Sequence, residues 1–229
     1  MDKLTPKKII EFRGLSERRI RSFIDELLTD NPADEEKEKR HYWQACLTAI
    51  GSACKQSKVA LIRERIDKLL TRKAAKTLKR TIQQYQRNIA ALHNFEEYDF
   101  SKIKPDQITF QTSPREKAIL TVKGLPVKVA PSYVFSFNEG GSKQIGAIWF
   151  VADKDGLRSD EFGIFLELMH RYLYANYGKT HTVNPEYCRV VEVFTGREMK
   201  YSDVNPDEIS ALLDKLVDAI KAAIRKAAK

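Results

Sequence analysis

Apolar and polar residues alternate along this chain with two different periods. Up to about residue 95, apolar residues recur at spacings of three and four, the period of helices that bury one face. From about Phe100 onward, short runs of β-branched and aromatic residues are separated by turn residues, a pattern typical of strands. We therefore predict an α+β protein with a helical N-terminal region, residues 1–95, and an α/β domain, residues 96–229, in which helices cover a mixed β-sheet. A helix over 72–94 would belong either to the first region or to the core of the second.

Helix start and stop signals divide the beginning of the chain. Thr5 followed by Pro6 begins a short helix that Gly14 ends, and Ser16 begins a second helix that runs to about Leu28. The sequence therefore predicts a helix, a tight turn and a second helix before residue 29.

A break is expected in the long helical region that follows. Residues 29–40 are polar and contain a proline, so they form a linker or the start of a third helix over 35–55. In the next helical region, residues 57–94, the apolar residues lie on one face at first and on a rotated face later. One straight helix would not give this pattern, so we place a break or strong bend near 71–75.

The positive charge of the chain is concentrated in the N-terminal region. Residues 1–95 contain 21 Lys and Arg against 12 Asp and Glu, a net charge of +9, whereas residues 96–229 are balanced at 19 each. Residues 55–87 alone carry 11 basic side chains and two acidic ones. A negatively charged partner would be attracted to this stretch. The candidate contacts opposite the apolar face of its second half are Arg72, Lys73, Lys76, Lys79, Arg80 and Arg87.

The stretch from Val127 to Gly156 has the clearest strand pattern. Two apolar runs, residues 133–137 and 145–152, flank a turn with two glycines, which predicts a β-hairpin. The second run is almost continuously apolar, so we expect it to be a central strand that is covered on both faces. Further strands are expected at 107–112, 118–123 and 189–194, and helices from Ser159 to Gly178 and from Asn205 onward.

Nothing in the sequence indicates a membrane or an oxidising compartment. No apolar run reaches 18 residues, and the N-terminus has no segment typical of a signal peptide. Cys46, Cys54 and Cys188 form no CxxC motif and cannot all pair with one another. Phosphate-binding loops and the GxSxG and HExxH motifs are missing. We therefore expect a cytoplasmic protein with no membrane partner, no cofactor and no metal.

The first two predicted helices resemble a DNA-binding unit. Residues 9–27 have Gly14 at the turn, followed by Leu15 and Ser16 as an apolar-plus-cap pair. They are similar to the bihelical unit of helix-turn-helix regulators, although almost no chain precedes them to supply the usual first helix. The alternative is two helices of a bundle with solvated arginines. On a recognition helix the contacts would be Arg18, Arg19 and Arg21.

The order of elements from residue 72 to about 195 is similar to the core of the restriction-endonuclease-like PD-(D/E)XK nuclease superfamily. The words PSYVFSF and GAIWFVADKDG, with the helix after them, resemble uncharacterised bacterial proteins placed near that superfamily. Such nucleases bind a divalent metal with an acid after the proline and an acid-x-lysine on the next strand. This chain has Ser132 after its proline, and Ala147, Ile148 and Trp149 on the next strand. The resemblance therefore implies a restriction-endonuclease-like core with a degenerate motif.

Carboxylates elsewhere would have to restore a metal site. The candidates are Glu192 on a strand, Glu161 at the start of a helix, and Asp153 with Lys154 in a turn. Each has a structural alternative, because acids stabilise helix starts, Asp-Gly turns are common, and a buried glutamate requires hydrogen-bond donors. Mg²⁺ would be a cofactor only if these residues formed a nuclease site.

We expect a non-catalytic protein that associates with nucleic acid or forms a complex, built on a degenerate nuclease-like core. The basic helix at 72–87 would contact the phosphate backbone without reading the base sequence. One alternative is a metal-dependent nuclease with relocated carboxylates. The other is a protein–protein adaptor whose basic face meets an acidic partner.

Overall fold

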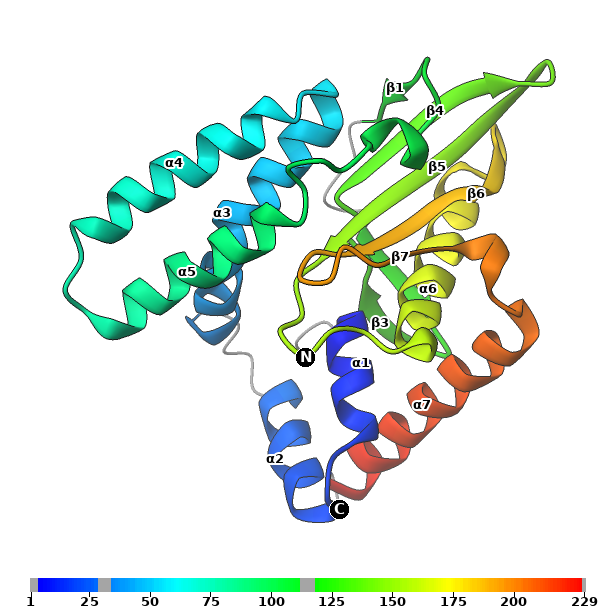
Figure 1. Cartoon of the computed structure of the whole chain (residues 1–229). Coiled ribbons are helices and arrows are strands. Elements are labelled where there is room, and N and C mark those ends of the chain that lie inside the picture. The colour runs from blue at the N-terminus through cyan, green and yellow to red at the C-terminus, as the bar shows by residue number, and fades with distance from the viewer. Residues whose placement is uncertain (1–3, 29–33, 112–117, 228–229) are drawn as a thin grey trace.

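The computed structural model of this chain describes residues 4–28, 34–111 and 118–227, without the side chains of 34–41. Within these residues the protein has the predicted α+β architecture, with seven α-helices, a mixed five-stranded sheet and a separate two-stranded sheet (Figure 1). The helices are α1 (Pro6–Arg13), α2 (Glu17–Leu28), α3 (Asp34–Gln56), α4 (Ala60–Ala74), α5 (Lys79–His93), α6 (Ser159–Tyr177) and α7 (Pro206–Ala227).

The larger sheet has the strand order β1-β4-β5-β6-β7, and β2 pairs with β3 in the smaller one. The strands are β1 (Thr109–Phe110), β2 (Ile119–Val122), β3 (Leu125–Lys128), β4 (Tyr133–Glu139), β5 (Ser142–Val151), β6 (Thr182–Glu192) and β7 (Glu198–Lys200). β1 is shorter than the strand predicted at 107–112, whose last residue lies outside the described residues. Short 3₁₀ helices, η1 (Phe100–Ile103) and η3 (Tyr201–Asp203), precede β1 and α7.

β4 and β5 form the predicted central hairpin. They pair antiparallel from Tyr133 opposite Ile148 to the turn that follows Glu139. The two turn residues, Gly140 and Gly141, have φ angles of 58° and 78°, which glycine adopts without strain. The prediction of this hairpin from its apolar runs and glycines is therefore confirmed.

β5 is the middle strand of the large sheet and is buried on both faces, as its apolar sequence predicted. Ala147 belongs to the hydrophobic cluster on the α6 side, and Ile148 to the cluster on the α3 side; both are 0% exposed. α6 connects β5 to β6, which runs parallel to it. The antiparallel hairpin and the parallel crossover together make the sheet mixed.

β6 begins earlier than the strand predicted at 189–194. Thr182 already pairs with β5, but the ladder is irregular around residues 184–187 before it resumes at Cys188. The asparagine and proline in this segment disfavour strands, so the pattern of the sequence concealed the first half of β6. The predicted strand was therefore too short, because the first half of β6 is held by its pairing with β5 and not by its own sequence.

One face of the sheet is covered by α6 together with α1, α2, α7 and the β2–β3 hairpin. Their apolar side chains form one cluster that includes Ile9, Ile24, Leu168 and Val217. Leu4 forms a parallel bridge with Val127 of β3, and α7 packs on both α1 and α2. The first two helices and the last helix therefore lie side by side (Figure 1).

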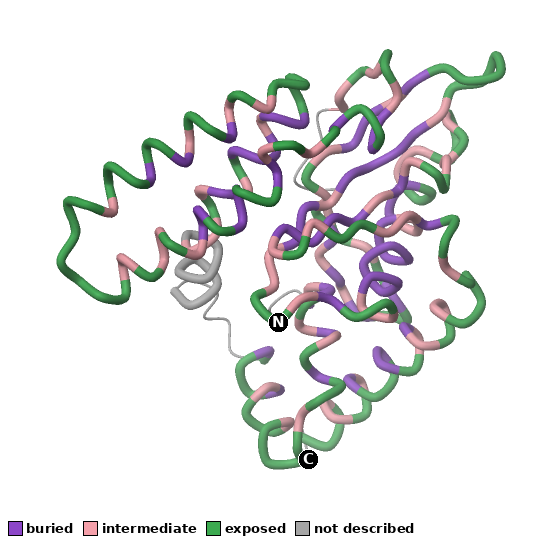
Figure 2. Tube along the Cα trace, viewed as in Figure 1, coloured by how far each residue is buried: buried purple, intermediate pink, exposed green. Residues whose placement is uncertain are grey.

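The other face is covered by α3, α4 and α5, residues 34–93, which we call the arm. Ile50, Leu69 and Leu92 of the arm join Ile148 and Phe150 of β5 in the second hydrophobic cluster. The arm packs on the sheet at one end, while its other end extends beyond it (Figure 1). Its outer end is largely exposed (Figure 2).

The predicted break in the arm is confirmed, at 75–78, and the chain reverses direction there. α4 and α5 pack against each other as a helical hairpin, which explains why their apolar faces are rotated along the sequence. Two assignments change as a result. Arg72 and Lys73 belong to the end of α4 instead of a single basic helix. Leu78, one of the apolar residues of 57–94 whose spacing predicted the second, rotated apolar face, precedes α5 and is 71% exposed.

Candidate nucleic-acid interface

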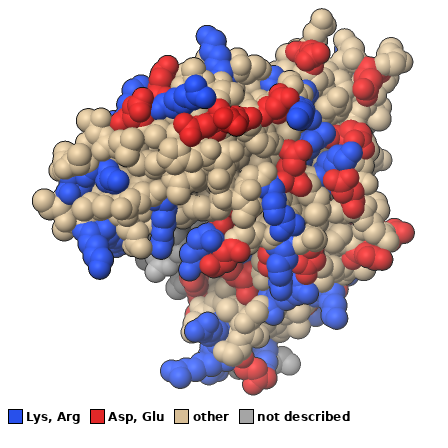
Figure 3. Space-filling view, in the orientation of Figure 1, with Lys and Arg blue, Asp and Glu red and all other residues tan. Residues whose placement is uncertain are grey.

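The candidate interface is the outer end of the arm, residues 72–80, which we call the arm tip. It contains the last turn of α4, the connecting turn and the first residues of α5. Several Lys and Arg side chains lie on and below this end of the arm in Figure 3. Five of its nine residues are basic: Arg72, Lys76, Lys79 and Arg80 are exposed, and Lys73 is partly exposed.

The arm tip has a single sign of charge. The sequence contains no Asp or Glu between Lys68 and Phe95. Lys68 is 4.0 Å from a carboxylate oxygen of Glu64, one turn earlier on α4. Within the described part of the chain, the arm-tip residues Arg72, Lys73, Lys76 and Lys79 take part in no ion pair. Like charges this close repel one another, so an anionic partner would be favoured here.

The backbone of α5 adds to the positive potential of the arm tip. The N–H groups at the start of a helix lack intrahelical partners and carry partial positive charge. Leu78 at the N-cap of α5 provides no side-chain hydrogen bond, and the first turn contains no acid. Lys79 and Arg80 stand at this end although the helix dipole disfavours cations there. Helix stability therefore does not explain these two residues.

Arg87, the sixth predicted contact, lies apart from the arm tip and serves the packing of the arm. It is partly buried, and its guanidinium donates a hydrogen bond to the Tyr42 hydroxyl over 3.3 Å. The neighbouring Asn88 is 1% exposed; its amide donates to the Tyr42 carbonyl oxygen and accepts from the Cys46 N–H. These contacts hold α5 against α3, so we assign Arg87 a structural role.

The arginines of α2 form a basic surface separate from the arm tip. Arg18, Arg19 and Arg21 are all exposed, whereas Ile24 and Leu27 on the same helix are 1% exposed. α7 packs on α1 and α2 and occupies the place of a third helix, although it comes from the far end of the chain. Figure 1 places α2 beside the end of α7 and away from the arm tip.

Glu192, the first of the candidate catalytic carboxylates, is fully buried and holds a turn. One carboxylate oxygen accepts the N–H of Phe194, and the other accepts the N–H and the hydroxyl of Thr195, over 2.7–2.8 Å. The side chain is 0% exposed, so substrate cannot reach it in this arrangement. Glu192 stabilises the end of β6, and its hydrogen bonds satisfy the buried charge.

Of the other three candidates, Asp153 and Lys154 lie on the loop between β5 and α6, and Glu161 lies in the first turn of α6. Glu161 accepts the N–H of Arg158 over 2.8 Å and pairs with its guanidinium, which caps the start of α6. Asp153 accepts the N–H of Asp155 and forms an ion pair with Lys7 over 2.9 Å. Lys154 is mostly exposed. No three metal-ligating side chains come together within the described residues.

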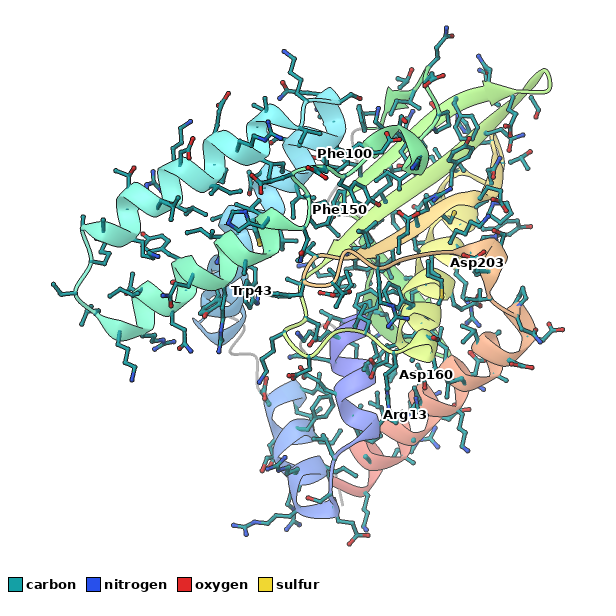
Figure 4. All side chains as sticks on the ribbon, in the orientation of Figure 1. Arg13, Trp43, Phe100, Phe150, Asp160 and Asp203 are labelled. Atoms are coloured by element: carbon teal, nitrogen blue, oxygen red, sulfur yellow. The ribbon has the colours of Figure 1, made fainter. Side chains whose placement is uncertain are left out.

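A neighbouring ion pair ties the first turn of α6 to α1. Arg13 and Asp160 point toward one another across the two elements and form a salt bridge (Figure 4). Burial acts to raise the pKa of Asp160, but the hydrogen bond and the charge of Arg13 outweigh it and lower that pKa. The carboxylates of Asp153, Asp160 and Glu161 therefore already form ion pairs or hydrogen bonds with cations and N–H groups of the protein.

The positions that correspond to the nuclease motif carry no ligand for a metal. Ala147 and Ile148 are 0% exposed in the two hydrophobic clusters, and Trp149 packs edge-on against Phe165 of α6. The hydroxyl of Ser132 accepts a hydrogen bond from the backbone N–H of Phe150 over 3.0 Å. This arrangement supports hairpin packing and offers neither a carboxylate nor a lysine to a phosphate.

A buried polar network between α6, η3 and α7 is absent from the predictions above. Arg171 donates to Glu167, one turn earlier on α6, and to Ser210 and Asp214 of α7, while the Tyr201 hydroxyl also donates to Glu167. The four-residue spacing of Glu167 and Arg171 on a helix could have predicted their ion pair. Their other partners come from α7 and η3, which are distant in sequence. The network joins α6 to the C-terminal helix and contains no open site.

Two other features have little reactive chemistry. Burial raises the pKa of the thiols of Cys46, Cys54 and Cys188 to about 12, which keeps them protonated and unreactive. An open depression of about 290 Å³ lies beside the β4–β5 turn, and its lining includes Lys143, Lys179 and His181. Its basic side chains are surface groups, and sequence reasoning did not single them out.

The arm tip is thus the most distinctive charged surface of the described molecule. None of the described helices combines the length and the apolar composition needed to cross a membrane. No family model, no curated protein and no solved structure matches this chain.

Proposed function

We propose that this protein is a non-catalytic nucleic-acid-binding protein that holds the phosphate backbone with its arm tip. The observation that carries the proposal is the group of five basic residues within 72–80, in a stretch of sequence without acids. Four of them have no ion pair among the described residues. Contacts between such cations and phosphates release counterions and provide most of the affinity of non-specific binding.

The shape of the arm supports contact through its end. α4 and α5 contain 15 residues each, so each is about 22 Å long. Two packed helices are together about 20 Å across, wider than the roughly 12 Å major groove that admits one helix. The hairpin would therefore meet the backbone with its tip, a mode that positions the protein without reading bases.

A degenerate restriction-endonuclease-like core is part of the same proposal. Its support is the chain order α5, β1, β4, β5, α6, β6, into which the separate β2–β3 hairpin is inserted after β1, together with apolar residues at the motif positions Ala147 and Ile148. The buried Glu192 and the helix-capping Glu161 offer no replacement. The arm would thus bind nucleic acid for a purpose other than cleavage, and no resident cofactor is required.

The α2 arginines are a second, weaker contact in this proposal. Arg18, Arg19 and Arg21 are exposed, but the surface that carries them lies far from the arm tip (Figure 1). One short duplex would contact the arm tip first, because the positive charge is densest there.

The test is a titration of labelled double- and single-stranded DNA and RNA at several salt concentrations, with Mg²⁺ present and product lengths checked. The variant replaces Lys73, Lys76 and Lys79 by Glu. We expect it to bind duplex DNA at least about tenfold more weakly and to lower the slope of log K against log salt by about 3. Shortened DNA or RNA products would show cleavage and would overturn the non-catalytic proposal.

A matched control reverses three exposed lysines elsewhere, Lys58, Lys143 and Lys179, so that the net charge is the same. It should keep most of the wild-type affinity and slope. Equal losses in both variants would mean that binding follows net charge and does not involve a defined arm tip. No binding of any nucleic acid by the wild type would favour the acidic protein partner instead.

A further inference from the structure

Leu78 occupies a position in the arm tip that neither helix stability nor packing explains. It is 71% exposed and belongs to neither hydrophobic cluster. It is also the N-cap of α5, where Ser, Thr, Asp and Asn are favoured and leucine is among the poorest residues. This large apolar side chain, at the end of a cationic hairpin, is therefore accessible to a partner.

The backbone holds Leu78 in a defined position. The N–H of Ile82 donates to the Leu78 carbonyl oxygen over 3.0 Å, which starts α5. On the other side of the turn, the N–H of Lys76 donates to the carbonyl oxygen of Lys73 over 3.1 Å, which ends α4. The turn that carries Leu78 is thus only the few residues between two packed helices. An insertion at this point would require little ordering of the chain.

Cations stand on both sides of Leu78. Lys76 and Lys79 are exposed within two residues of it, and Arg72 and Lys73 end the neighbouring helix. Proteins that bend or open nucleic acids combine these two elements: basic side chains hold the phosphates, and an apolar side chain enters between two base pairs. The cost of opening a base step falls where stacking is already weakened.

We propose that Leu78 is a wedge that inserts between bases, so that the arm tip prefers duplexes with interrupted stacking, such as a bulge or a mismatch, over perfect duplexes. This inference rests on the proposed nucleic-acid function and adds a substrate class to it. The lysines and arginines would bind any duplex, and Leu78 would make the protein prefer a duplex with interrupted stacking over a perfect one.

An anionic lipid surface is the competing partner, and the packing of the arm argues against it. Helices that bind membranes lie in the interface with a broad apolar face toward the lipid. In the arm those faces are turned inward, since Leu69 is 1% and Leu92 0% exposed. Among the described large apolar side chains of the arm, only those of Leu78 and Leu70, the latter 43% exposed, are exposed.

The experiment compares a perfect DNA duplex with the same duplex that contains one bulged base, next to which 2-aminopurine reports unstacking by its fluorescence. We expect the wild type to bind the bulged duplex about tenfold more tightly and to raise the fluorescence. Leu78→Ala should abolish both effects while its affinity for the perfect duplex changes less than about threefold. Leu78→Met should retain the preference, and so should the control Leu70→Ala.

The outcomes separate this inference from the proposed function. Equal affinity of the wild type for the two duplexes, with binding still lost in the lysine-to-glutamate variant, would overturn the wedge and leave the proposed function intact. Absence of binding to either duplex would overturn the wedge, and absence of binding to every DNA and RNA in the titration above would overturn the proposed function as well. Binding to phosphatidylserine-containing vesicles that Leu78→Ala removes, without any effect of this change on DNA, would overturn the wedge in favour of a lipid surface.

Discussion

The sheet with α6 and α7 and the tip of the arm use charged residues in opposite ways. In the sheet region, arginines between neighbouring elements have carboxylate partners: Arg171 pairs with Glu167 and Asp214, and Arg189 with Glu198. At the arm tip, Lys76 and its neighbours stand in a stretch with no acid at all. The first arrangement joins elements of the protein to one another. The second leaves charge available to a partner.

This difference separates residues that stabilise the protein from residues that can bind something. Both regions are rich in Lys and Arg, so composition alone does not distinguish them. Buried or bidentate pairs are sensitive to removal of one partner, whereas isolated surface charges contribute little to folding. Substitutions in the two regions should therefore have different effects on folding and on binding.

The largest effect on stability is expected for Arg171→Ala. This change leaves the carboxylate of Glu167, which is 4% exposed, with the Tyr201 hydroxyl as its remaining partner in the network. We expect the free energy of unfolding to fall by about 3 kcal/mol, because breaking a buried pair leaves a charge uncompensated. Urea denaturation followed by circular dichroism measures it.

The matched control is Lys76→Ala at the arm tip, which should change the free energy of unfolding by less than about 0.5 kcal/mol. Nucleic-acid binding should respond in the opposite order, with Lys76→Ala weakened and Arg171→Ala close to the wild type at a temperature where it is folded. If Lys76→Ala destabilised the protein as much as Arg171→Ala, the division between the two regions would be wrong.

A smaller loss of stability is expected for Glu192→Ala. It removes the acceptor for two backbone N–H groups and one hydroxyl at the end of β6. We expect a loss of about 2 kcal/mol, the cost of leaving buried donors without partners. Thermal unfolding should detect it, and Glu192→Gln should lose less because it keeps one oxygen. Unchanged stability of both variants would contradict the structural role of Glu192.

The smallest expected effect is a pH dependence that comes from His170. Burial lowers the pKa of this imidazole, whose ring stacks on Tyr201 with centroids 4.1 Å apart. As the pH falls through 6.5, the unfolded chain takes up the proton before the folded protein does, so stability is lost below that pH and is fully present above it. Denaturation at pH 5 and pH 8 should show less pH dependence for His170→Phe than for the wild type. If His170→Phe and the wild type showed the same pH dependence of stability, His170 would not be its source.

Local signals in the sequence predicted most of the elements correctly. Gly140 and Gly141 between two apolar runs were sufficient to define the hairpin, since only a tight turn uses two such glycines there. Thr5, whose hydroxyl accepts the N–H of Lys8, and Gly14 correctly defined α1. β6 was found only in part, because its first half contains residues that disfavour strands and is held by pairing with β5.

The sequence by itself determined the α+β class, the central place of β5 and the excess of positive charge at 55–87, because these follow from the local order of residues. Only the tertiary structure decided which charges have partners. Arg87 and Arg72 are equivalent in the sequence, yet one packs against Tyr42 of α3 and the other stands at the arm tip. The spacing of apolar residues predicted that Leu78 would be buried, but it is exposed. The chain reverses direction at 75–78, and this turn places Leu78 outside both helices. Burial and pairing depend on neighbours that are distant in sequence, which no local pattern contains.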